Sequence, residues 1–340
     1  MVVALGHDSQ IEVVGTAIDP YNAREKILAL KPDVLTLDVD MPRMDGITFL
    51  KILMKHHPMP IIVISALTTA GSEKALEALQ EGAVDVLAKP TGSWSIGELS
   101  EVLAEKVKAA ASANIRLLGG NIPAAGSPAQ MATSHAFDPR KVVLIGASTG
   151  GTEALKCLVS RLPANFPGIC VAQHIPAQFS KKFAERLNKV GSMRAQEAAD
   201  GDRVKPSLVL VAPGDFHMLL QRDMDHSSRE TRDWLVRLKQ GPPVWHQRPA
   251  VDVLFNSAVT QAGADFVGVI LTGMGRDGAE GMRRLKQKGA STIAQDEESC
   301  VVFGMPKAAI DLGVVDHIVP LKKIPQVLIE LAKLSHGKTA

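Results

Sequence analysis

Short apolar runs alternate with segments of helical periodicity over the first hundred residues. Runs rich in Val, Ile and Leu predict buried strands, because a strand covered on both faces is apolar throughout. They occupy residues 12–17, 33–39, 60–66 and 83–89. Between them, apolar residues recur at helical spacing over 22–30, 46–56 and 72–80. Strands that alternate with helices indicate right-handed crossovers, so a doubly wound, mostly parallel α/β domain is expected.

The same alternation returns after residue 140. Strands are predicted over residues 141–147, 168–174, 208–214, 265–273 and 290–296. Amphipathic helices are predicted over 152–162, 180–190, 251–263 and 278–289. Residues 217–224 and 233–240 predict an antiparallel excursion, with the polar run 225–232 as its turn. The pattern thus indicates a second doubly wound α/β domain.

A stretch without periodicity separates the two halves. From Ala109 to Phe137 the only Asp, Glu, Lys or Arg is Arg116, and the rest is mostly Ala, Ser, Gly and Pro. Such a segment buries little, so a linker is predicted, although a helix could continue through its first alanines. The expected domains are residues 1–106 and 138–340, joined by a linker over 107–137.

Composition narrows the class of protein. The 340 residues are 46% hydrophobic and 22% charged, as in an ordinary globular protein, and the formal net charge of +2 argues against a nucleic-acid partner. Three scattered cysteines exclude a disulfide framework and a clustered zinc site. No apolar stretch reaches the roughly 18 residues of a membrane span. The first ten residues also lack the regions of a signal peptide, so a cytoplasmic protein is expected.

Three polar residues end strands of the first domain: Asp38, Ser65 and Lys89. The carboxyl ends of parallel strands share one edge of the sheet, where chemistry usually sits. An aspartate there can accept a phosphoryl group as an acyl phosphate. A lysine can neutralise the added charge, and a hydroxyl on the next strand can respond to it. Any one of these residues alone would more often be an ordinary solvated side chain at a strand end, and only the three together favour a phosphorylation site.

These residues, within the segments 37–46, 65–66 and 89–90, resemble a response-regulator receiver domain. The resemblance implies that Asp38 is the phosphoacceptor, Ser65 the switch hydroxyl and Lys89 the lysine that contacts the phosphate. It also implies a Mg²⁺ ion held by Asp38 and by the backbone at Asp40.

The chain departs from the receiver pattern at two places. No acidic pair precedes Asp38, and Val86 stands where receivers carry an aromatic switch residue. The first residues resemble the end of the receiver's first helix. We therefore expect that the sequence starts late by about 15–20 residues, the length of a strand and most of a helix.

A serine follows the first strand of the second domain, in the run GASTGG at 146–151. The G-x-S-x-G spacing permits the sharp strand-to-helix turn that exposes a nucleophile. A serine needs a base, and the base needs a residue that orients it. His174 ends the next strand, and Asp277 lies in a Gly-rich turn after a later one. Ser148, His174 and Asp277 should therefore meet at one edge of the sheet.

A nucleotide-binding loop is the main alternative for GASTGG. Its spacing fits neither G-x-G-x-x-G nor the P-loop pattern. The loops of short-chain dehydrogenases are closer, but those enzymes need a catalytic tyrosine, and the only tyrosine here is Tyr21 in the other domain. The order Ser, His, Asp also differs from the Ser, Asp, His order of α/β-hydrolases.

The second domain resembles the catalytic domain of chemotaxis protein-glutamate methylesterases, the CheB family. The matching blocks are residues 145–151, 172–187, 212–218, 248–255, 271–279 and 294–310. The receiver and linker in front match the family's domain order. The resemblance implies hydrolysis of glutamate γ-methyl esters on the cytoplasmic helices of chemoreceptors, with release of methanol and no catalytic cofactor, and deamidation of receptor glutamines. The implied partners are methyl-accepting chemoreceptors and a chemotaxis histidine kinase, and a monomer is expected.

By the same resemblance, Ser148 is the nucleophile, His174 the general base and Asp277 the residue that orients the imidazole. Thr149 and the backbone of Met274 would line the substrate and oxyanion region. His217 is a rival base, and Asp252 is either a helix cap or part of the site. A phospho-regulated module that binds receptors without catalysis is the alternative function, which an esterase assay would separate from the enzyme.

Overall fold

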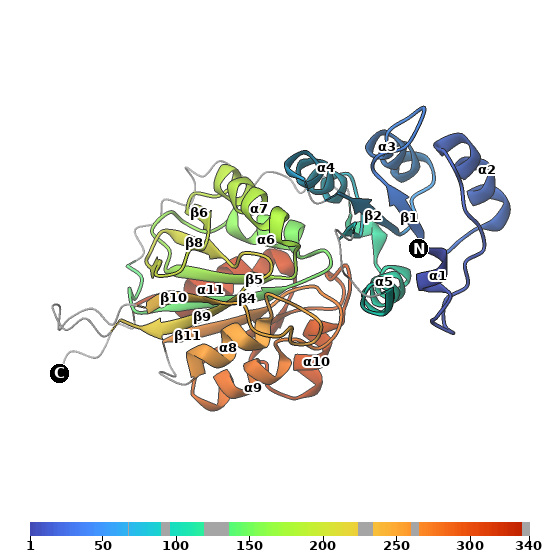
Figure 1. Ribbon diagram of the computed structural model, residues 1–340. Coiled ribbons are helices and arrows are strands. Elements are labelled where there is room, and N and C mark those ends of the chain that lie inside the picture. Colours follow the sequence, from blue (N-terminus) through green and yellow to red (C-terminus); the bar gives the residue numbers. More distant parts are fainter. Residues whose placement is uncertain (67, 90–95, 119–135, 224–233, 260–264, 335–340) are drawn as a thin grey trace, which may run out of the picture. The chain divides into compact units, whose positions relative to one another are not determined.

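The chain builds a parallel sheet in each of two units, residues 1–120 and 121–340 (Figure 1). The computed structural model describes residues 1–66, 68–89, 96–118, 136–223, 234–259 and 265–334. Both sheets are parallel and carry helices, as the alternation of strands and helices predicts. The α/β fold class is therefore confirmed.

Unit 1 contains a three-stranded parallel sheet in the order β1-β2-β3. Its strands are β1 (Leu35–Asp38), β2 (Ile61–Ser65) and β3 (Asp85–Ala88). Its helices are α1 (Val2–Leu5), α2 (Pro20–Leu30), α3 (Gly46–His56), α4 (Thr69–Gln80) and α5 (Ile96–Ala111). Asp45 caps α3 by accepting the N–H groups of Ile47 and Thr48, so this helix begins directly after the loop that follows β1.

Two segments of unit 1 differ from expectation. The strand predicted over residues 12–17 is wrong, because no strand forms there. A strand needs a hydrogen-bonded neighbour, and none of the three described strands pairs with this segment; instead, Lys26 donates to the Thr16 carbonyl. Helix α5 runs to Ala111, into the range predicted as linker. Ala109 and Ala110 are buried, and alanine has the highest helix propensity, so the helix continues.

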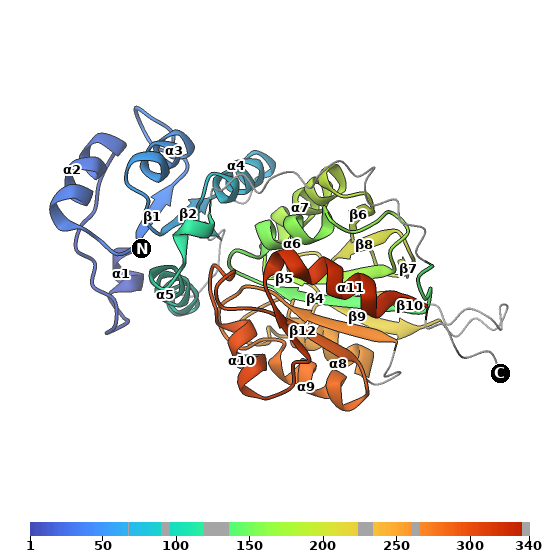
Figure 2. The same ribbon diagram turned by 180° about the vertical axis from the view of Figure 1, so that it is seen from behind.

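Unit 2 contains a seven-stranded parallel sheet in the order β13-β12-β11-β4-β5-β8-β6. Its strands are β4 (Val142–Ala147), β5 (Gly168–Gln173), β6 (Arg194–Glu197), β8 (Leu208–Val211), β11 (Phe266–Ile270), β12 (Ser291–Gln295) and β13 (His317–Val319). Helices α6 (Gly151–Val159), α7 (Ala177–Val190) and α11 (Ile324–Ala332) lie on one face of this sheet (Figures 1 and 2). Helices α8 (Val251–Val259), α9 (Ala279–Gln287) and α10 (Met305–Asp311) lie on the other.

A small antiparallel sheet adds to unit 2, in the order β7-β10-β9. It consists of β7 (Arg203–Val204), β9 (His217–Arg222) and β10 (Trp234–Lys239). The pairing of β9 with β10 confirms the predicted antiparallel excursion. The polar run 225–232, predicted as its turn, lies outside the described residues.

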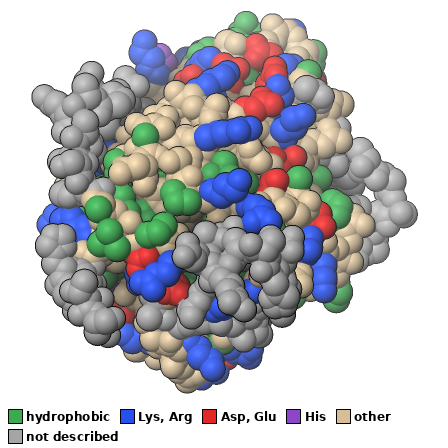
Figure 3. All heavy atoms as spheres, turned by 90° about the vertical axis from the view of Figure 1, so that its left-hand side faces the viewer, with side chains coloured by type: hydrophobic (Ala, Val, Ile, Leu, Met, Phe, Trp, Pro, Cys, Tyr) green, Lys and Arg blue, Asp and Glu red, His purple; other side chains and the backbone are tan. Residues whose placement is uncertain are grey.

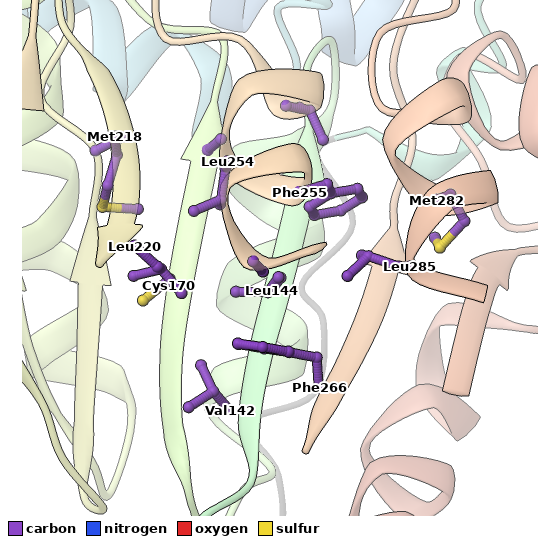
Figure 4. Close-up of a cluster of buried hydrophobic side chains, with 14 of the residues drawn as sticks. Val142, Leu144, Cys170, Met218, Leu220, Leu254, Phe255, Phe266, Met282 and Leu285 are labelled. Atoms are coloured by element: carbon purple, nitrogen blue, oxygen red, sulfur yellow. The ribbon is translucent and has the colours of Figure 1, made fainter. Parts of the chain in front are cut away.

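One hydrophobic core cluster of unit 2 lies between its large sheet, the small sheet and helices α8 and α9 (Figure 4). Leu144 of β4 and Phe255 of α8 are fully buried there. Met218 of β9 packs into the same cluster. Cys170 of β5 also belongs to it, and burial raises the pKa of its thiol to about 12, so it is an unreactive core residue.

Charged side chains of both signs cover the surface. On the face shown in Figure 3, Lys and Arg side chains form separate groups with Asp and Glu between them. This face therefore carries no large field of one sign, in keeping with the formal net charge of +2. In the ranges that the structure describes, no helix combines the length and apolar character needed to cross a bilayer.

The core assignment makes a testable prediction for stability. Leu144→Ala should lower the free energy of unfolding of unit 2 by about 2–5 kcal/mol, since it leaves a cavity in the central strand. Urea unfolding followed by tryptophan fluorescence measures this loss, because Trp234 lies in the same core. Ile318→Ala on edge strand β13, where the side chain is exposed, is the matched control and should change stability by less than about 1 kcal/mol. Equal losses in the two variants would contradict the core assignment.

Candidate active site

Ser148 lies in the sharp turn between β4 and α6. The strand ends at Ala147 and the helix begins at Gly151, so the chain reverses over three residues. Gly150 adopts a left-handed φ of 76°, and a Cβ atom there would lie 2.6 Å from Cβ of Val301. Only glycine meets both conditions without strain. The Ser148 N–H donates to the Thr272 carbonyl at 3.1 Å, which ties the turn to the loop after β11.

His174 follows β5 on the neighbouring strand. Ala147 and Gln173 are paired in the parallel register, so Ser148 and His174 are the next residues along adjacent strands. The His174 N–H donates to the Ala147 carbonyl at 3.0 Å, which extends this alignment past the strand ends. Among the described residues no hydrogen bond joins Ser148 Oγ to the imidazole, and such contacts often tighten only when substrate binds.

Asp277 completes the group from the loop between β11 and α9. Its Oδ2 lies 2.8 Å from His174 Nε2, and both side chains are buried, at 2% and 4% exposure. The backbone N–H groups of Val251 and Asp252, at the start of α8, donate to the Asp277 carboxylate at 2.7 and 2.8 Å. A buried carboxylate needs such donors, and the positive end of a helix dipole adds to them.

These contacts fix the chemistry that the imidazole can perform. An ionised carboxylate only accepts hydrogen bonds, so His174 Nε2 carries a proton and donates a hydrogen bond to Asp277. Nδ1 is then the unprotonated nitrogen. It can take the proton of a nearby hydroxyl, and the imidazolium so formed lies against a buried anion.

Buried polar side chains hold the two carbonyl groups of the turn. Gln173 Nε2 donates to the Ser148 carbonyl at 2.9 Å, and Thr272 Oγ1 donates to the Thr149 carbonyl at 3.0 Å. Gln295 in turn accepts the Thr272 N–H at 2.9 Å. The turn is thus fixed from three neighbouring strand ends, a network that the sequence analysis missed.

Thr149 and Met274, the residues expected to line the oxyanion region, directly follow Ser148 and Gly273, whose backbones lie close together. Thr149 is buried directly after Ser148, and Met274 is partly exposed in the loop between β11 and α9. That loop is pinned because the Gly273 carbonyl accepts the N–H groups of Gly304 and Met305. Within the described part of the chain, the Met274 N–H donates to no backbone carbonyl.

His217 and Asp252 take structural positions. His217 Nε2 contacts the Pro242 carbonyl at 2.9 Å, and its Nδ1 accepts the Ala250 N–H at 3.3 Å, so both ring nitrogens are engaged. Asp252 accepts hydrogen bonds from Trp245 Nε1 at 2.9 Å and from the Gly281 N–H at 2.7 Å. Burial, together with the Asp277 charge, raises the pKa of the Asp252 carboxyl.

Unit 1 has its own polar edge. Asp38, at the end of β1, forms an ion pair with Lys89 at 2.7 Å, and the Asp40 N–H donates to Asp38 at 3.0 Å. Ser65, at the end of β2, is buried and donates to the Gly71 carbonyl at 2.9 Å. The structure therefore brings Asp38 and Lys89 into contact and places Ser65 on the strand between those that carry them.

The described residues of unit 1 supply only part of a Mg²⁺ site. Asp38 is paired with Lys89, and Asp40 is paired with Lys74 at 3.1 Å; these ion pairs are exposed, so a metal ion could replace either lysine. In the described ranges no three His, Cys, Asp or Glu side chains are grouped as a metal site would require.

Comparisons with known proteins agree across the chain. Residues 143–328 match the CheB methylesterase family, and residues 1–101 match the response regulator receiver domain. The chain is 52% identical over 322 residues to protein-glutamate methylesterase/protein-glutamine glutaminase 2 of Syntrophus aciditrophicus, covering 94% of this chain and 92% of that protein. It is 46% identical over 340 residues to the protein-glutamate methylesterase/protein-glutamine glutaminase of Salmonella typhimurium, covering 99% and 94%.

A solved structure is similar to unit 2. The crystal structure of the Thermotoga maritima CheB methylesterase catalytic domain superposes with a TM-score of 0.53 at 42% identity, covering 56% of this chain and 98% of that one.

The turn at Gly150 makes a prediction that a matched glycine can isolate. Gly150→Ala should destabilise unit 2 by the cost of a left-handed alanine, about 1–2 kcal/mol, plus about 1–3 kcal/mol for the contact with Val301. Gly289 has a similar φ of 86°, but a Cβ atom there would meet nothing within 4 Å. Gly289→Ala should therefore lower the stability of unit 2 only by the cost of a left-handed alanine. Urea unfolding measures both, and equal losses would show that crowding does not fix the turn.

Proposed function

This chain belongs to the CheB methylesterase family, and we propose that it is a protein-glutamate methylesterase whose nucleophile is Ser148. It hydrolyses glutamate γ-methyl esters on chemoreceptors to glutamate and methanol. It also deamidates receptor glutamines, because an amide carbonyl in the same position undergoes the same attack and releases ammonia. Its receiver domain makes this activity responsive to phosphorylation.

The observation that supports the catalytic roles is the buried pair of His174 and Asp277 beside Ser148. His174 Nδ1 takes the Ser148 hydroxyl proton as Oγ attacks the ester carbonyl, which gives a tetrahedral intermediate. The imidazolium is stabilised by Asp277 at 2.8 Å and returns the proton to the departing methoxide. Water, deprotonated by His174, then attacks the acyl-enzyme, releasing glutamate and restoring the Ser148 hydroxyl.

The oxyanion of the intermediate requires donors that are already in place. The Met274 N–H has no backbone acceptor among the described residues, and Ser148 precedes the N-terminus of α6. We assign the Met274 N–H and the segment at Thr149 to this role. The side chains of Gln173 and Thr272 support it, because they hold the carbonyl groups of the turn.

The receiver controls this site through Asp38. A phosphoryl group transferred from a phosphohistidine of a chemotaxis histidine kinase would form an acyl phosphate on Asp38, and Lys89 would pair with its added charge. Such a modification shifts the population between conformations of different activity. The kinase and the receptor ends that carry the esters place the protein in the cytoplasm.

The triad assignment predicts a graded loss of activity. Ser148→Ala should lower the rate of methanol release from methylated receptors by roughly 10⁴-fold or more. Asp277→Asn keeps the shape but loses the anion, so it should lower the rate by roughly 10³–10⁴-fold. Ser160→Ala, directly after the helix that follows Ser148, is the matched control and should keep wild-type activity. His217→Gln should retain most of the kcat. A Ser148→Ala variant with wild-type activity would exclude the serine mechanism.

The receiver assignment predicts one modified residue. Incubation of the full chain with acetyl phosphate should add a single phosphoryl group, detected by intact mass, and Asp38→Asn should block it. Asp33→Asn, just before the same strand β1, is the matched control and should leave the modification in place. Equal phosphorylation of wild type and Asp38→Asn, or none in the wild type, would contradict the role of Asp38.

A further inference from the structure

An exposed tryptophan and an exposed arginine lie together next to the triad. The Arg276 guanidinium lies 5.4 Å from the centroid of the Trp245 ring, a cation–π contact. Trp245 is 48% exposed although it is a large apolar side chain. We call these two side chains the Trp245–Arg276 platform.

The platform is connected to the triad by short links. Arg276 is the residue directly before Asp277. Trp245 Nε1 donates to the Asp252 side chain at 2.9 Å, and the Asp252 N–H donates to the Asp277 carboxylate at 2.8 Å. The exposed ring and guanidinium therefore lie on the surface next to the buried carboxylate that orients His174.

Arg276 has no acidic partner in the described ranges. In the described part of the chain it forms no ion pair with an acidic side chain. The nearby Glu280 is engaged elsewhere, because Arg283 and Arg284 bind it, which lowers the pKa of its carboxyl to about 2. A guanidinium held by a cation–π contact rather than by an ion pair can still donate its N–H groups to an external carboxylate.

The turn that carries Trp245 is held in a costly conformation. Val244 and Gln247 exchange two backbone hydrogen bonds, at 3.1 and 2.9 Å, around Trp245 and His246. Both central residues have left-handed φ values, 53° and 57°, where Asn and Gly are usual. Residues other than Asn and Gly disfavour this conformation because Cβ crowds the following carbonyl oxygen.

Contacts around the turn offset this cost. Arg248 pairs with Asp215, and His217 binds the Pro242 carbonyl and the Ala250 N–H. A turn that is strained, braced on both sides and used to present an aromatic ring to solvent points to a binding role.

We propose that the Trp245–Arg276 platform binds the receptor helix beside the reacting ester, with Arg276 pairing with a glutamate carboxylate one helical turn away. The inference rests on the proposed function, since the substrate is then a helix that carries glutamate side chains. Residues three or four positions apart lie on one face of such a helix, about 5–6 Å apart. The Trp245 ring packs against the aliphatic part of the same face.

Substitutions in the full chain test this inference by separating binding from catalysis. With a methylated receptor fragment as substrate, Arg276→Gln should raise KM about three- to tenfold, and Arg276→Glu should raise it further. Raising the salt concentration should raise the KM of the wild type more than that of Arg276→Gln, because salt screens the proposed ion pair. Trp245→Asn removes the ring but suits a left-handed φ, so it should raise KM without unfolding the turn. Arg284→Gln removes an equal charge from α9 and is the matched control, with KM unchanged.

The substrate supplies a second arm of the test. When the glutamates one turn from the ester are replaced by alanine, which the enzyme cannot convert to glutamate, wild type and Arg276→Gln should have the same KM, which a merely structural role of Arg276 would not produce. Equal KM values for the two enzymes on the unaltered fragment would overturn the inference while leaving the esterase intact.

Binding of the Ser148→Ala chain to the same fragment keeps the two hypotheses distinct. This variant should bind the methylated fragment, and adding Arg276→Gln should weaken binding about three- to tenfold. Absence of methanol release by the wild type would refute the proposed function, and the binding comparison would still decide the platform. Equal dissociation constants for Ser148→Ala with and without Arg276→Gln would refute the proposed role of the platform.

Discussion

The active site depends on how one buried carboxylate, that of Asp277, is compensated. Only 2% of this side chain is exposed, so its charge would be very costly without partners. The N–H groups of Val251 and Asp252 and the ring of His174 supply them. Helix α8 can lie this close to strand β4 because β4 has a glycine, Gly146, at the contact. A Cβ atom there would lie 2.3 Å from a Val251 methyl group. The position of His174, and hence the base available to Ser148, follows from this packing.

Each unit has a charged pair at the carboxyl-end edge of its parallel sheet, and the two pairs differ in how far they are exposed to solvent. In unit 2 the pair of Asp277 and His174 is almost completely buried, which favours a fixed geometry. In unit 1 the side chains of Asp38 and Lys89 are 40% and 36% exposed, so their ion pair is weak and easily exchanged for a new one. The buried pair of Asp277 and His174 suits a proton transfer that needs the same geometry in every turnover. The exposed pair of Asp38 and Lys89 suits a carboxylate that is modified and later restored.

Sequence reasoning placed residues that follow strand ends at one sheet edge, and it missed the contacts that these residues make with neighbouring side chains. Ser148, His174 and Asp277 could be placed together because the ends of parallel strands share an edge. The contact of Trp245 with Asp252 arises in a turn with no periodicity, and Gln173 acts through an amide that no motif marks. The strand predicted at residues 12–17 was wrong because an apolar run specifies a strand only where a neighbour can pair with it. Edge strands β6 and β13 are short, so their sequence pattern is weak.

Asp252 connects recognition with catalysis through two different groups. Its backbone N–H holds Asp277, and its side chain holds Trp245 and the Gly281 N–H of α9. The start of α8 thus supports both the carboxylate that binds His174 and the ring for which we propose contact with the substrate helix. Misplacement of a reacting carbonyl by about 1 Å can cost 10²-fold in rate. In the proposed complex, the substrate helix and His174 are therefore both positioned from the start of α8. Binding energy gained away from the ester is in this way used to align the ester with Ser148.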